Sequence, residues 1–318
     1  MADLNPKVSV IGCGNVGMRY AYALMLEGVV RQIVLVDVDR NRLEGEVMDL
    51  SHCAPYISPV EIIAGDYPDI KNSQIVVITA GKKSKPGQTR LDMAADNVEI
   101  YKRIVPEIVE YAPSAIFLIV SNPVDVLSYA AYKLSGKPAR EVIGSGTVLD
   151  TARLRFLLGK HCGVDSRNIH AYILGEHGDS EFPVWSRAMI GGVLFKDYCS
   201  ICKNSHTCEQ EKDLNRIFSE VRDSAYRIVE RKQETSYGIG LALVRITQAI
   251  INDEKAILPV SSLVEDYLGI DNVYLSLPAV VDKQGVREIL KIELDPQERE
   301  AFRNSAKVIR GVIQETGL

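Results

Sequence analysis

The chain has 318 residues, of which 46% are hydrophobic and 25% charged, with a formal net charge of −5. These values are ordinary for a globular protein with its own core, the length predicts about two domains, and the absence of a basic stripe argues against nucleic acid as a partner. No apolar run is long enough to span a membrane and the first residues lack a signal-peptide pattern, so we expect a cytoplasmic protein.

A predicted strand over residues 7–12 runs directly into a glycine-rich turn and then into an apolar helix over 18–26. The turn reads Gly12-Cys13-Gly14-Asn15-Val16-Gly17. Between a strand and a helix, this G-x-G-x-x-G string indicates dinucleotide binding. The first glycine permits the tight turn, the second lets the backbone approach a pyrophosphate, and the third lets the helix pack on the strand. The amide groups at the helix N-terminus then face the phosphates.

The second predicted strand, over 32–36, ends at an acidic residue that selects the cofactor. Asp37 lies 20 residues after Gly17 (37 − 17 = 20). A carboxylate at this place accepts hydrogen bonds from the adenosine ribose and repels a 2′-phosphate, which favours NAD over NADP. The alternative is a solvated acid at a strand end.

The rest of the first half continues the alternation of strands and helices. We predict helices over 40–49 and 91–111, strands over 60–64, 74–79 and 115–120, and a polar loop over 80–90 that can close over a site. This pattern predicts an α/β fold with a Rossmann-type, doubly wound parallel sheet. Ligands bind at the carboxyl ends of such strands, where the sequence places Gly12, Asp37, Gly81 and Asn122.

The second half changes character after a Gly-Ser-Gly turn, so we expect a dinucleotide-binding domain over 1–145 and a mixed α+β substrate-binding catalytic domain over 146–318. The predicted helix that opens this domain carries Asp150 and Arg153 on one face, because they are three residues apart. Arg155 points elsewhere on the same helix. Further helices are expected over 210–231, 236–252 and 296–315, with hairpin strands between 256 and 294.

The loop Gly175-Glu176-His177-Gly178-Asp179-Ser180 holds the candidate acid/base. Imidazole suits proton transfer near neutral pH, and Asp150 can orient the ring as the carboxylate of a catalytic triad does. Arg153 can hold a substrate carboxylate with two parallel hydrogen bonds. Arg90, on the polar loop, can polarise the substrate carbonyl. The simpler alternatives are a turn histidine and an exposed surface arginine.

The cysteines divide into two groups. Cys13, Cys53 and Cys162 are expected to be reduced thiols. Thiolates and an imidazole suit tetrahedral zinc, and the second group offers them at Cys199, Cys202, His206 and Cys208. The spacing of this second group is irregular and its segment reads as a polar surface loop, which favours incidental cysteines and no metal.

Five motifs in the same order resemble the lactate/malate dehydrogenase family, and within it the bacterial L-lactate dehydrogenases. They are 11–17, Ser121-Asn122-Pro123-Val124-Asp125, Gly144-Ser145-Gly146, Leu149-Asp150-Thr151-Ala152-Arg153 and 175–180. The resemblance implies an NAD-dependent oxidoreductase of fermentative glycolysis that interconverts pyruvate and L-lactate. It also implies a homotetramer, because family members usually form one.

The same resemblance implies roles for individual residues. His177 would be the proton donor and acceptor, with Asp150 as its partner, while Arg153 would bind the substrate carboxylate and Arg90 the polarised carbonyl. Asn122 would contact both the substrate and the cofactor. The peptide bond from Asn122 to the following proline would be cis. Thr235 would line the substrate pocket. Cofactor contacts would come from Val16, Asp37, Arg42, Tyr67, Gly81 and Val120.

Ser84 departs from the family pattern at the position that contacts the substrate side chain. Lactate enzymes usually carry glutamine there and malate enzymes arginine. A neutral serine cannot pair a second carboxylate, which argues against malate, but its small size leaves open a bulkier 2-hydroxy acid. A third alternative is an NAD-binding protein without catalysis, which would be expected to have lost His177, Asp150 or Arg153.

Arg155 and His170 match the two positions that bind fructose 1,6-bisphosphate between subunits in bacterial family members. Phosphate favours arginine forks and protonatable imidazole, and ligand binding there would favour the assembled state by mass action. An allosteric enzyme is therefore expected. The alternative is that both residues make ordinary structural contacts.

Overall fold

The first half of the chain alternates helices with short strands made of branched aliphatic residues. All residues of β4 and β5 are buried, as expected for parallel strands covered on both faces. The computed structural model describes residues 5–82, 93–201 and 210–318. The elements of the first half are β1 (Lys7–Ile11), α1 (Asn15–Glu27), β2 (Gln32–Val36), α2 (Arg40–Ser51), β3 (Glu61–Ala64), β4 (Ile75–Ile78), α3 (Ala94–Tyr111), β5 (Ile116–Ile119), α4 (Val124–Ser135) and β6 (Val142–Gly144).

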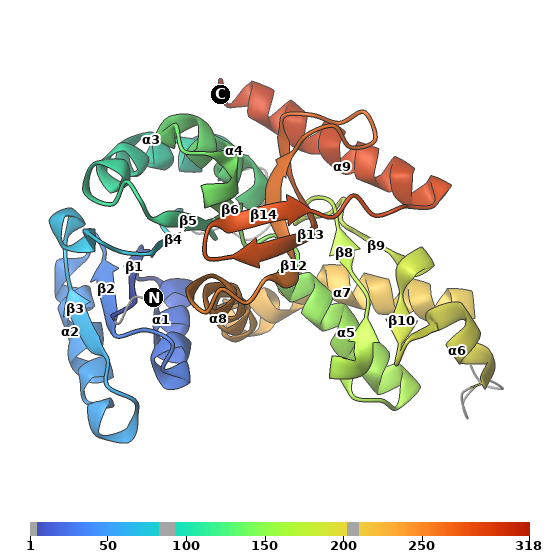
Figure 1. Cartoon of the computed structure of the whole chain (residues 1–318), viewed down its shortest axis with the longest axis horizontal. Helices are drawn as coiled ribbons and strands as arrows, with labels where there is room; N and C mark the ends of the chain where they lie inside the picture. Colours follow the sequence, from blue (N-terminus) through green and yellow to red (C-terminus); the bar gives the residue numbers. More distant parts are fainter. Residues whose placement is uncertain (1–4, 83–92, 202–209) are drawn as a thin grey trace.

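The second half mixes short strands, long helices and a three-stranded meander (Figure 1). Its helices are α5 (Val148–Cys162), α6 (Phe195–Ile201), α7 (Gln210–Lys232), α8 (Tyr237–Ile251) and α9 (Pro296–Glu315). Its strands are β7 (Ile169–His170), β8 (Ile173–Leu174), β9 (Phe182–Pro183), β10 (Met189–Ile190), β11 (Val193–Leu194), β12 (Ala256–Val264), β13 (Val273–Asp282) and β14 (Gly285–Ile289).

The main sheet of the described residues has nine strands in the order β14-β13-β12-β6-β5-β4-β1-β2-β3. The six strands from β3 to β6 are parallel and follow the Rossmann order, which confirms the predicted fold class. The meander β12–β14 extends this sheet antiparallel to β6, through the pair Ser261 and Gly144. Strand order reverses between β1 and β4, so the ligand crevice of such a sheet lies at their carboxyl ends.

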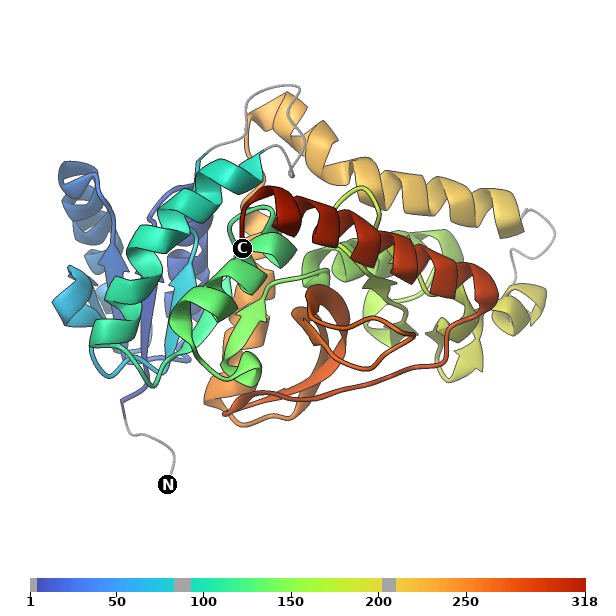
Figure 2. The ribbon, with the colours of Figure 1, turned by 90° about the horizontal axis from the view of Figure 1, so that it is seen from above.

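Two layers of helices cover the sheet. In β2, Val34 and Val36 face one hydrophobic cluster while Ile33 and Leu35 face the other, as side chains alternate along a strand. The first cluster includes residues of α3, α4 and α9, and the second includes residues of α1 and α8, which pack side by side. Figure 2 shows α9 crossing over the second half and ending near α4. Both halves of the chain therefore contribute residues to the two hydrophobic clusters that cover the main sheet.

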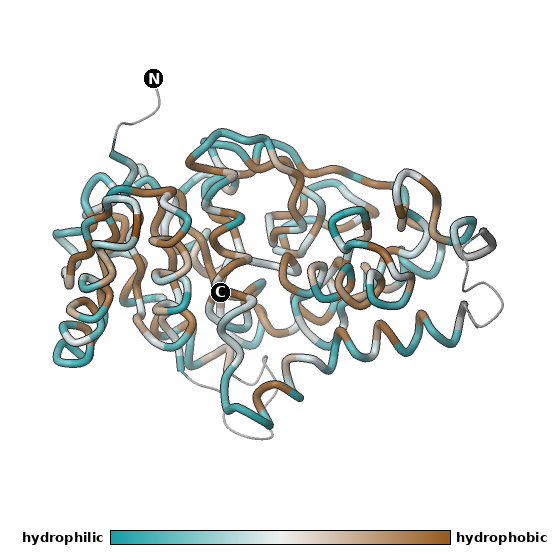
Figure 3. The backbone as a smooth tube through the Cα atoms, turned by 90° about the horizontal axis from the view of Figure 1, so that it is seen from below, coloured by the Kyte–Doolittle hydropathy of each residue, from teal (hydrophilic) through white to brown (hydrophobic). Residues whose placement is uncertain are grey.

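A third, smaller cluster lies beneath α5 and α7, where Leu154, Leu158, Ile169, Ile217 and Val221 are buried together. The long helix α7 alternates hydrophilic and hydrophobic residues along its length (Figure 3), as a helix with one buried face must. Within the described ranges, no helix combines the length and the apolar character that a bilayer span requires.

The predicted polar loop around the second cysteine group is wrong at its start. Cys199 lies in the helix α6, which is anchored because Phe195 in its first turn is buried in the third cluster. Cys202, His206 and Cys208 fall outside the described residues. The zinc hypothesis therefore stays a hypothesis.

Candidate active site

The glycine-rich turn between β1 and α1 is shaped by close backbone contacts. Gly12 has a φ of +97°, which disfavours a side chain, and a Cβ there would lie 2.5 Å from the backbone nitrogen of Ala80. A Cβ on Gly17 would collide with the carbonyl oxygen of Gly12. No atom lies within 4 Å of the place that a Cβ on Gly14 would take. The turn is therefore packed against the sheet at two glycines and open at the third.

The open glycine begins α1, and the acidic end of β2 lies beside it. Gly14 is the N-cap and gives no side-chain hydrogen bond to the first amides of the helix, which therefore attract an anion. The Asp37 carboxylate accepts hydrogen bonds from the amides of Cys13 (2.6 Å) and Asp39 (2.9 Å). Burial, reinforced by the Asp37 carboxylate, raises the pKa of the Cys13 thiol to about 12, so this thiol stays neutral.

An asparagine from α3 ties together the segments that follow β4 and β5. Asn97 accepts a hydrogen bond from the amide of Lys82 (2.8 Å) and donates one to the carbonyl oxygen of Asn122 (2.7 Å). The bond from Asn122 to Pro123 is cis, as the resemblance implied. Oδ1 of Asn122 is buried and has no hydrogen-bond partner within the described part of the chain. A buried acceptor of this kind is suited to a ligand donor.

The remaining residues expected at the cofactor fall into three places. Three lie at the same edge of the sheet as the glycine turn, in the first turn of α1 or just after β4 and β5: Val16, Gly81 and Val120. Arg42 lies on α2, exposed, with its side chain 3.3 Å from Glu46. Tyr67 begins the short 3-10 helix that follows β3. In the described part of the chain, the hydrogen bonds donated by the Arg42 side chain thus run along its own helix.

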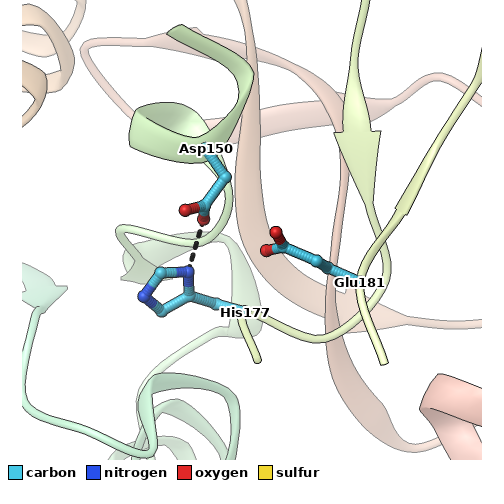
Figure 4. Close-up of side chains that lie close together, drawn as sticks. All are labelled: Asp150, His177 and Glu181. Carbon is cyan, nitrogen blue, oxygen red and sulfur yellow. Dashed lines mark hydrogen bonds and ion pairs between the residues drawn. The ribbon is translucent and has the colours of Figure 1, made fainter. Parts of the chain in front are cut away.

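Asp150 joins two of the predicted site residues. Its side chain is 2% exposed and lies in the first turn of α5. One carboxylate oxygen is 2.5 Å from Nδ1 of His177, and the other accepts a hydrogen bond from Arg153 at 2.7 Å; Figure 4 shows the imidazole ring turned toward Asp150. With Nδ1 engaged, Nε2 of His177 is the nitrogen that can exchange a proton with a substrate. Arg153, 14% exposed, can hold a carboxylate beside it.

The histidine loop is fastened by acidic residues to which the sequence reasoning gave no role. The amide of His177 donates to Asp125 at 2.8 Å, and Asp125 accepts a second bond from Ser261 at 2.5 Å. Glu176 accepts hydrogen bonds from the amide and hydroxyl of Ser180. Asp125 is 1% exposed. An acidic residue in the otherwise apolar start of α4 was the available signal, since a buried carboxylate needs donors.

A third buried acid near the histidine was also missed. Glu181 is 5% exposed, and one of its carboxylate oxygens lies within 4.8 Å of a ring nitrogen of His177 and of an oxygen of Asp150. The repeated acids at Glu176 and Glu181, either side of a glycine-bounded histidine, were the only sequence signal.

Of three further residues expected at the substrate, one lies in the described part of the chain and two do not. Thr235 is half-buried in the segment between α7 and α8. Ser84 and Arg90 lie outside the described residues. Their expected roles therefore rest on the sequence.

The family model of the lactate/malate dehydrogenase NAD-binding domain matches residues 6–144, and that of the α/β C-terminal domain matches 147–317. The chain belongs to the lactate/malate dehydrogenase family. It is 50% identical over 310 residues to a protein of Thermoanaerobacter sp. named L-lactate dehydrogenase, covering 97% of this chain and 98% of the relative. It is 47% identical over 315 residues to an L-lactate dehydrogenase of Clostridium perfringens, covering 98% of each chain.

Two solved structures extend this likeness to three dimensions. A lactate dehydrogenase from a Medee basin deep-sea metagenome library superimposes with a TM-score of 0.93 at 47% identity, covering 99% of both chains. The minor L-lactate dehydrogenase of Enterococcus mundtii gives 0.92 at 39% identity, covering 98% of this chain and 99% of that one. As a family member, the chain is an NAD-dependent 2-hydroxy acid dehydrogenase.

The first half of this dehydrogenase fits its NAD cofactor. The gap left by the missing Cβ of Gly14 and the amides at the start of α1 suit a pyrophosphate. Asp37, held against the turn by Cys13, lies where ribose hydroxyls are expected. The buried acceptor of Asn122 adds a polar contact at the end of β5.

Arg155 and His170, the expected anion site, lie on neighbouring elements of this dehydrogenase. The Nε of Arg155 donates to the carbonyl oxygen of Ala171 at 3.1 Å, and its guanidinium lies 5.3 Å from the ring centre of Tyr172. Burial lowers the pKa of Arg155 from its usual value. His170 is exposed on β7, directly before Ala171. Arg155 therefore reaches the strand that presents His170.

Proposed function

We propose that this dehydrogenase interconverts pyruvate and L-lactate with NAD as the hydride carrier. The observation that carries the proposal is Asp150 holding both His177 and Arg153, in a chain half-identical over nearly its whole length to a protein named L-lactate dehydrogenase. A 2-keto acid needs a proton donor for its carbonyl oxygen and a cation for its carboxylate, and these two side chains supply them. Reduction of pyruvate regenerates NAD in fermentative glycolysis.

His177 and Arg153 divide the work on the substrate. NADH, when bound, supplies the hydride to the carbonyl carbon of pyruvate. Protonated His177 gives its Nε2 proton to the carbonyl oxygen, while Asp150 stabilises the imidazolium through Nδ1. Arg153 binds the carboxylate and fixes which face of the carbonyl is presented. Arg90 stabilises the charge that develops on the carbonyl oxygen, and Asn122 and Thr235 line the substrate.

The carboxyl edge of the parallel strands would hold the cofactor. The turn at Gly14 would hold its pyrophosphate, and Asp37 would hold its adenosine ribose with a carboxylate that would exclude a 2′-phosphate. The cofactor contacts we propose are Gly12, Gly14, Val16, Gly17, Asp37, Arg42, Tyr67, Gly81, Val120 and Asn122. We also propose the division into domains at 1–145 and 146–318, with the site between them.

The assembled enzyme is proposed to be a cytoplasmic homotetramer. Large apolar side chains are more than a third exposed on α1, α2, α5 and α8, which supports contacts with further copies. They are Tyr22, Leu26, Met48, Phe156, Tyr237 and Leu241. Arg155 and His170 are proposed to bind fructose 1,6-bisphosphate and to make the enzyme allosteric.

The test is a steady-state comparison of pyruvate, oxaloacetate and branched 2-keto acids with NADH. We expect pyruvate to have the highest kcat/KM. Preference for oxaloacetate or for a branched acid would contradict the lactate assignment and leave a dehydrogenase for malate or a bulkier 2-hydroxy acid.

A further inference from the structure

Ile173 of β8 turns its backbone polar groups away from the neighbouring strand. The amide of Val184 donates to the carbonyl oxygen of Tyr172 at 2.9 Å, directly beside the paired residues of β8 and β9. In an antiparallel pair, successive residues direct their N–H and C=O groups to opposite sides. Ile173 therefore points both groups away from β9, and because this residue is fully buried, they need partners within the protein.

Two threonines at the start of α5 supply those partners. The hydroxyl of Thr151 accepts a hydrogen bond from the amide of Ile173 at 3.0 Å. The hydroxyl of Thr147, the N-cap residue of α5, donates to the carbonyl oxygen of Ile173 at 2.5 Å. Both threonines are buried, so water does not compete for these bonds. Side chains of α5 thus bond the edge of β8 where a further strand would otherwise pair.

The bonded segment leads directly to the histidine. Gly175 exchanges two backbone hydrogen bonds with β13, at 3.1 and 2.8 Å, and His177 follows two residues later. On the side of the helix, Thr151 lies directly after Asp150 and two residues before Arg153. The hydroxyl of Thr151 therefore joins this part of α5 to the segment that leads to His177.

We propose that Thr151 is a positioning residue, whose hydroxyl holds His177 in place against Asp150 and so sets the rate of proton transfer to pyruvate. This inference rests on the proposed function, because it takes His177 as the proton donor. The ring of His177 and the carboxylate of Asp150 come from different elements (Figure 4) and meet at 2.5 Å. A shift of β8 against α5 would disturb this contact, and a misplacement of about 1 Å can cost about a hundredfold in rate.

The experiment compares Thr151→Val, Thr151→Ser and Thr247→Val with the wild type in pyruvate reduction. Valine keeps the branched shape of threonine but leaves the buried amide of Ile173 without its acceptor, which is unfavourable. We expect kcat of Thr151→Val to fall between about tenfold and a hundredfold. KM for pyruvate and NADH affinity should stay within severalfold of wild type, because Arg153 and the glycine turn are unchanged. Thr151→Ser keeps the hydroxyl and should recover most of kcat.

Thr247 of α8 provides the matched control. It is fully buried, and its hydroxyl shares a hydrogen bond of 2.7 Å with the hydroxyl of Tyr20, at the contact of α8 with α1. Both valine variants should therefore lower the melting temperature by similar amounts, while kcat falls in Thr151→Val and stays near wild type in Thr247→Val. Equal effects of the two on kcat, or a failure of Thr151→Ser to recover activity, would overturn the inference.

A second measurement needs neither substrate nor turnover. A proton held between the His177 ring and Asp150 should give a low-field signal in proton NMR, assigned by its loss in His177→Asn. This signal should move or broaden in Thr151→Val and keep its position in Thr247→Val. That result in an enzyme that fails to reduce pyruvate would refute the proposed function and leave the positioning role standing. An unmoved signal in folded Thr151→Val would overturn the positioning role, whatever happens to kcat.

Discussion

A single buried carboxylate organises the chemistry of this dehydrogenase at the scale of residues. Asp150 accepts from the ring of His177 with one oxygen and from Arg153 with the other. The proposed proton donor and the proposed cation for the substrate are thus held at a set separation by one rigid helix turn. Loss of either donor would leave part of a buried negative charge uncompensated, which costs more than the hydrogen bond itself.

Replacement of His177 by alanine should abolish most turnover but spare NADH binding. General acid–base catalysis contributes between about 100-fold and 10,000-fold, and we expect a loss of kcat in that range. NADH affinity, measured by fluorescence titration, should stay close to wild type because the glycine turn and Asp37 are the proposed cofactor contacts. Near-normal turnover, or loss of NADH binding, would contradict the assignment of His177.

Ser84 is predicted to face the side chain of the substrate, and Ser84→Arg should favour a dicarboxylate. A guanidinium there can pair the second carboxylate of oxaloacetate. We expect the ratio of kcat/KM for oxaloacetate over pyruvate to rise by roughly tenfold. Ser84→Gln is the matched control, since it lengthens the side chain without adding charge. An equal ratio in all three enzymes would mean that Ser84 does not contact the substrate.

Asp37→Ser should weaken the discrimination against NADPH, because it removes the negative charge that repels a 2′-phosphate. The readout is the ratio of kcat/KM for NADH over NADPH at constant ionic strength. The substitution also removes the acceptor for Cys13, so NADH binding should weaken somewhat. A ratio identical to wild type would make Asp37 only a solvated strand end.

At the scale of elements, the six-residue turn between β1 and α1 has some glycines that pack against the protein and one that stays open to a ligand. Gly17 lets the first turn of α1 approach Gly12, whereas Gly14 faces open space. The helix is thereby fixed against the sheet while its N-terminal amides remain accessible. The two glycines are alike in sequence but differ in what their missing Cβ atoms would meet.

This difference predicts opposite results for two alanine substitutions. Gly17→Ala should destabilise the protein by about 1–3 kcal/mol, because the added methyl group collides with backbone. Gly14→Ala should keep the melting temperature, since its φ of −73° suits alanine, yet should weaken NADH binding by filling the pyrophosphate gap. Thermal unfolding and NADH titration of both variants check this. Equal melting temperatures for the pair would refute the packing argument.

At the scale of the whole molecule, α5 and the strands beside it connect the site to the expected anion site. Arg155 follows Arg153 by two residues on α5, and it bonds the carbonyl oxygen of Ala171, six residues before His177. A shift of α5 or of this segment, caused by an anion near His170, would therefore reach both proposed catalytic side chains.

Fructose 1,6-bisphosphate at millimolar concentration is expected to shift the pyruvate saturation curve to lower concentrations and to favour the proposed tetramer. Mass action predicts both effects if the ligand binds the assembled form more tightly. Light scattering and initial rates at acidic and neutral pH provide the measurements, and Arg155→Gln should remove the response. A curve that the ligand leaves unmoved at both pH values would rule out activation.

Sequence alone determined the features that depend on local order along the chain. The glycine string and the aliphatic strands predicted the Rossmann sheet and NAD, and the C-terminal helix over 296–315 was predicted at its observed bounds. Its capping box at Asp295 and Glu298 is a local signal. Such signals can be recognised in the sequence because turns, helix caps and strand alternation require particular residue types at short spacing, independently of the tertiary structure.

Only the tertiary structure decided which distant residues meet. β12 to β14 join the Rossmann sheet through Ser261 and Gly144, and nothing in either segment's pattern names the other as its partner. The same holds for Asp125 under the His177 amide. A buried acid has no local pattern that identifies its partners, because those partners are set by the packing of whole elements. For that reason the charges that surround His177 became visible only in the folded chain.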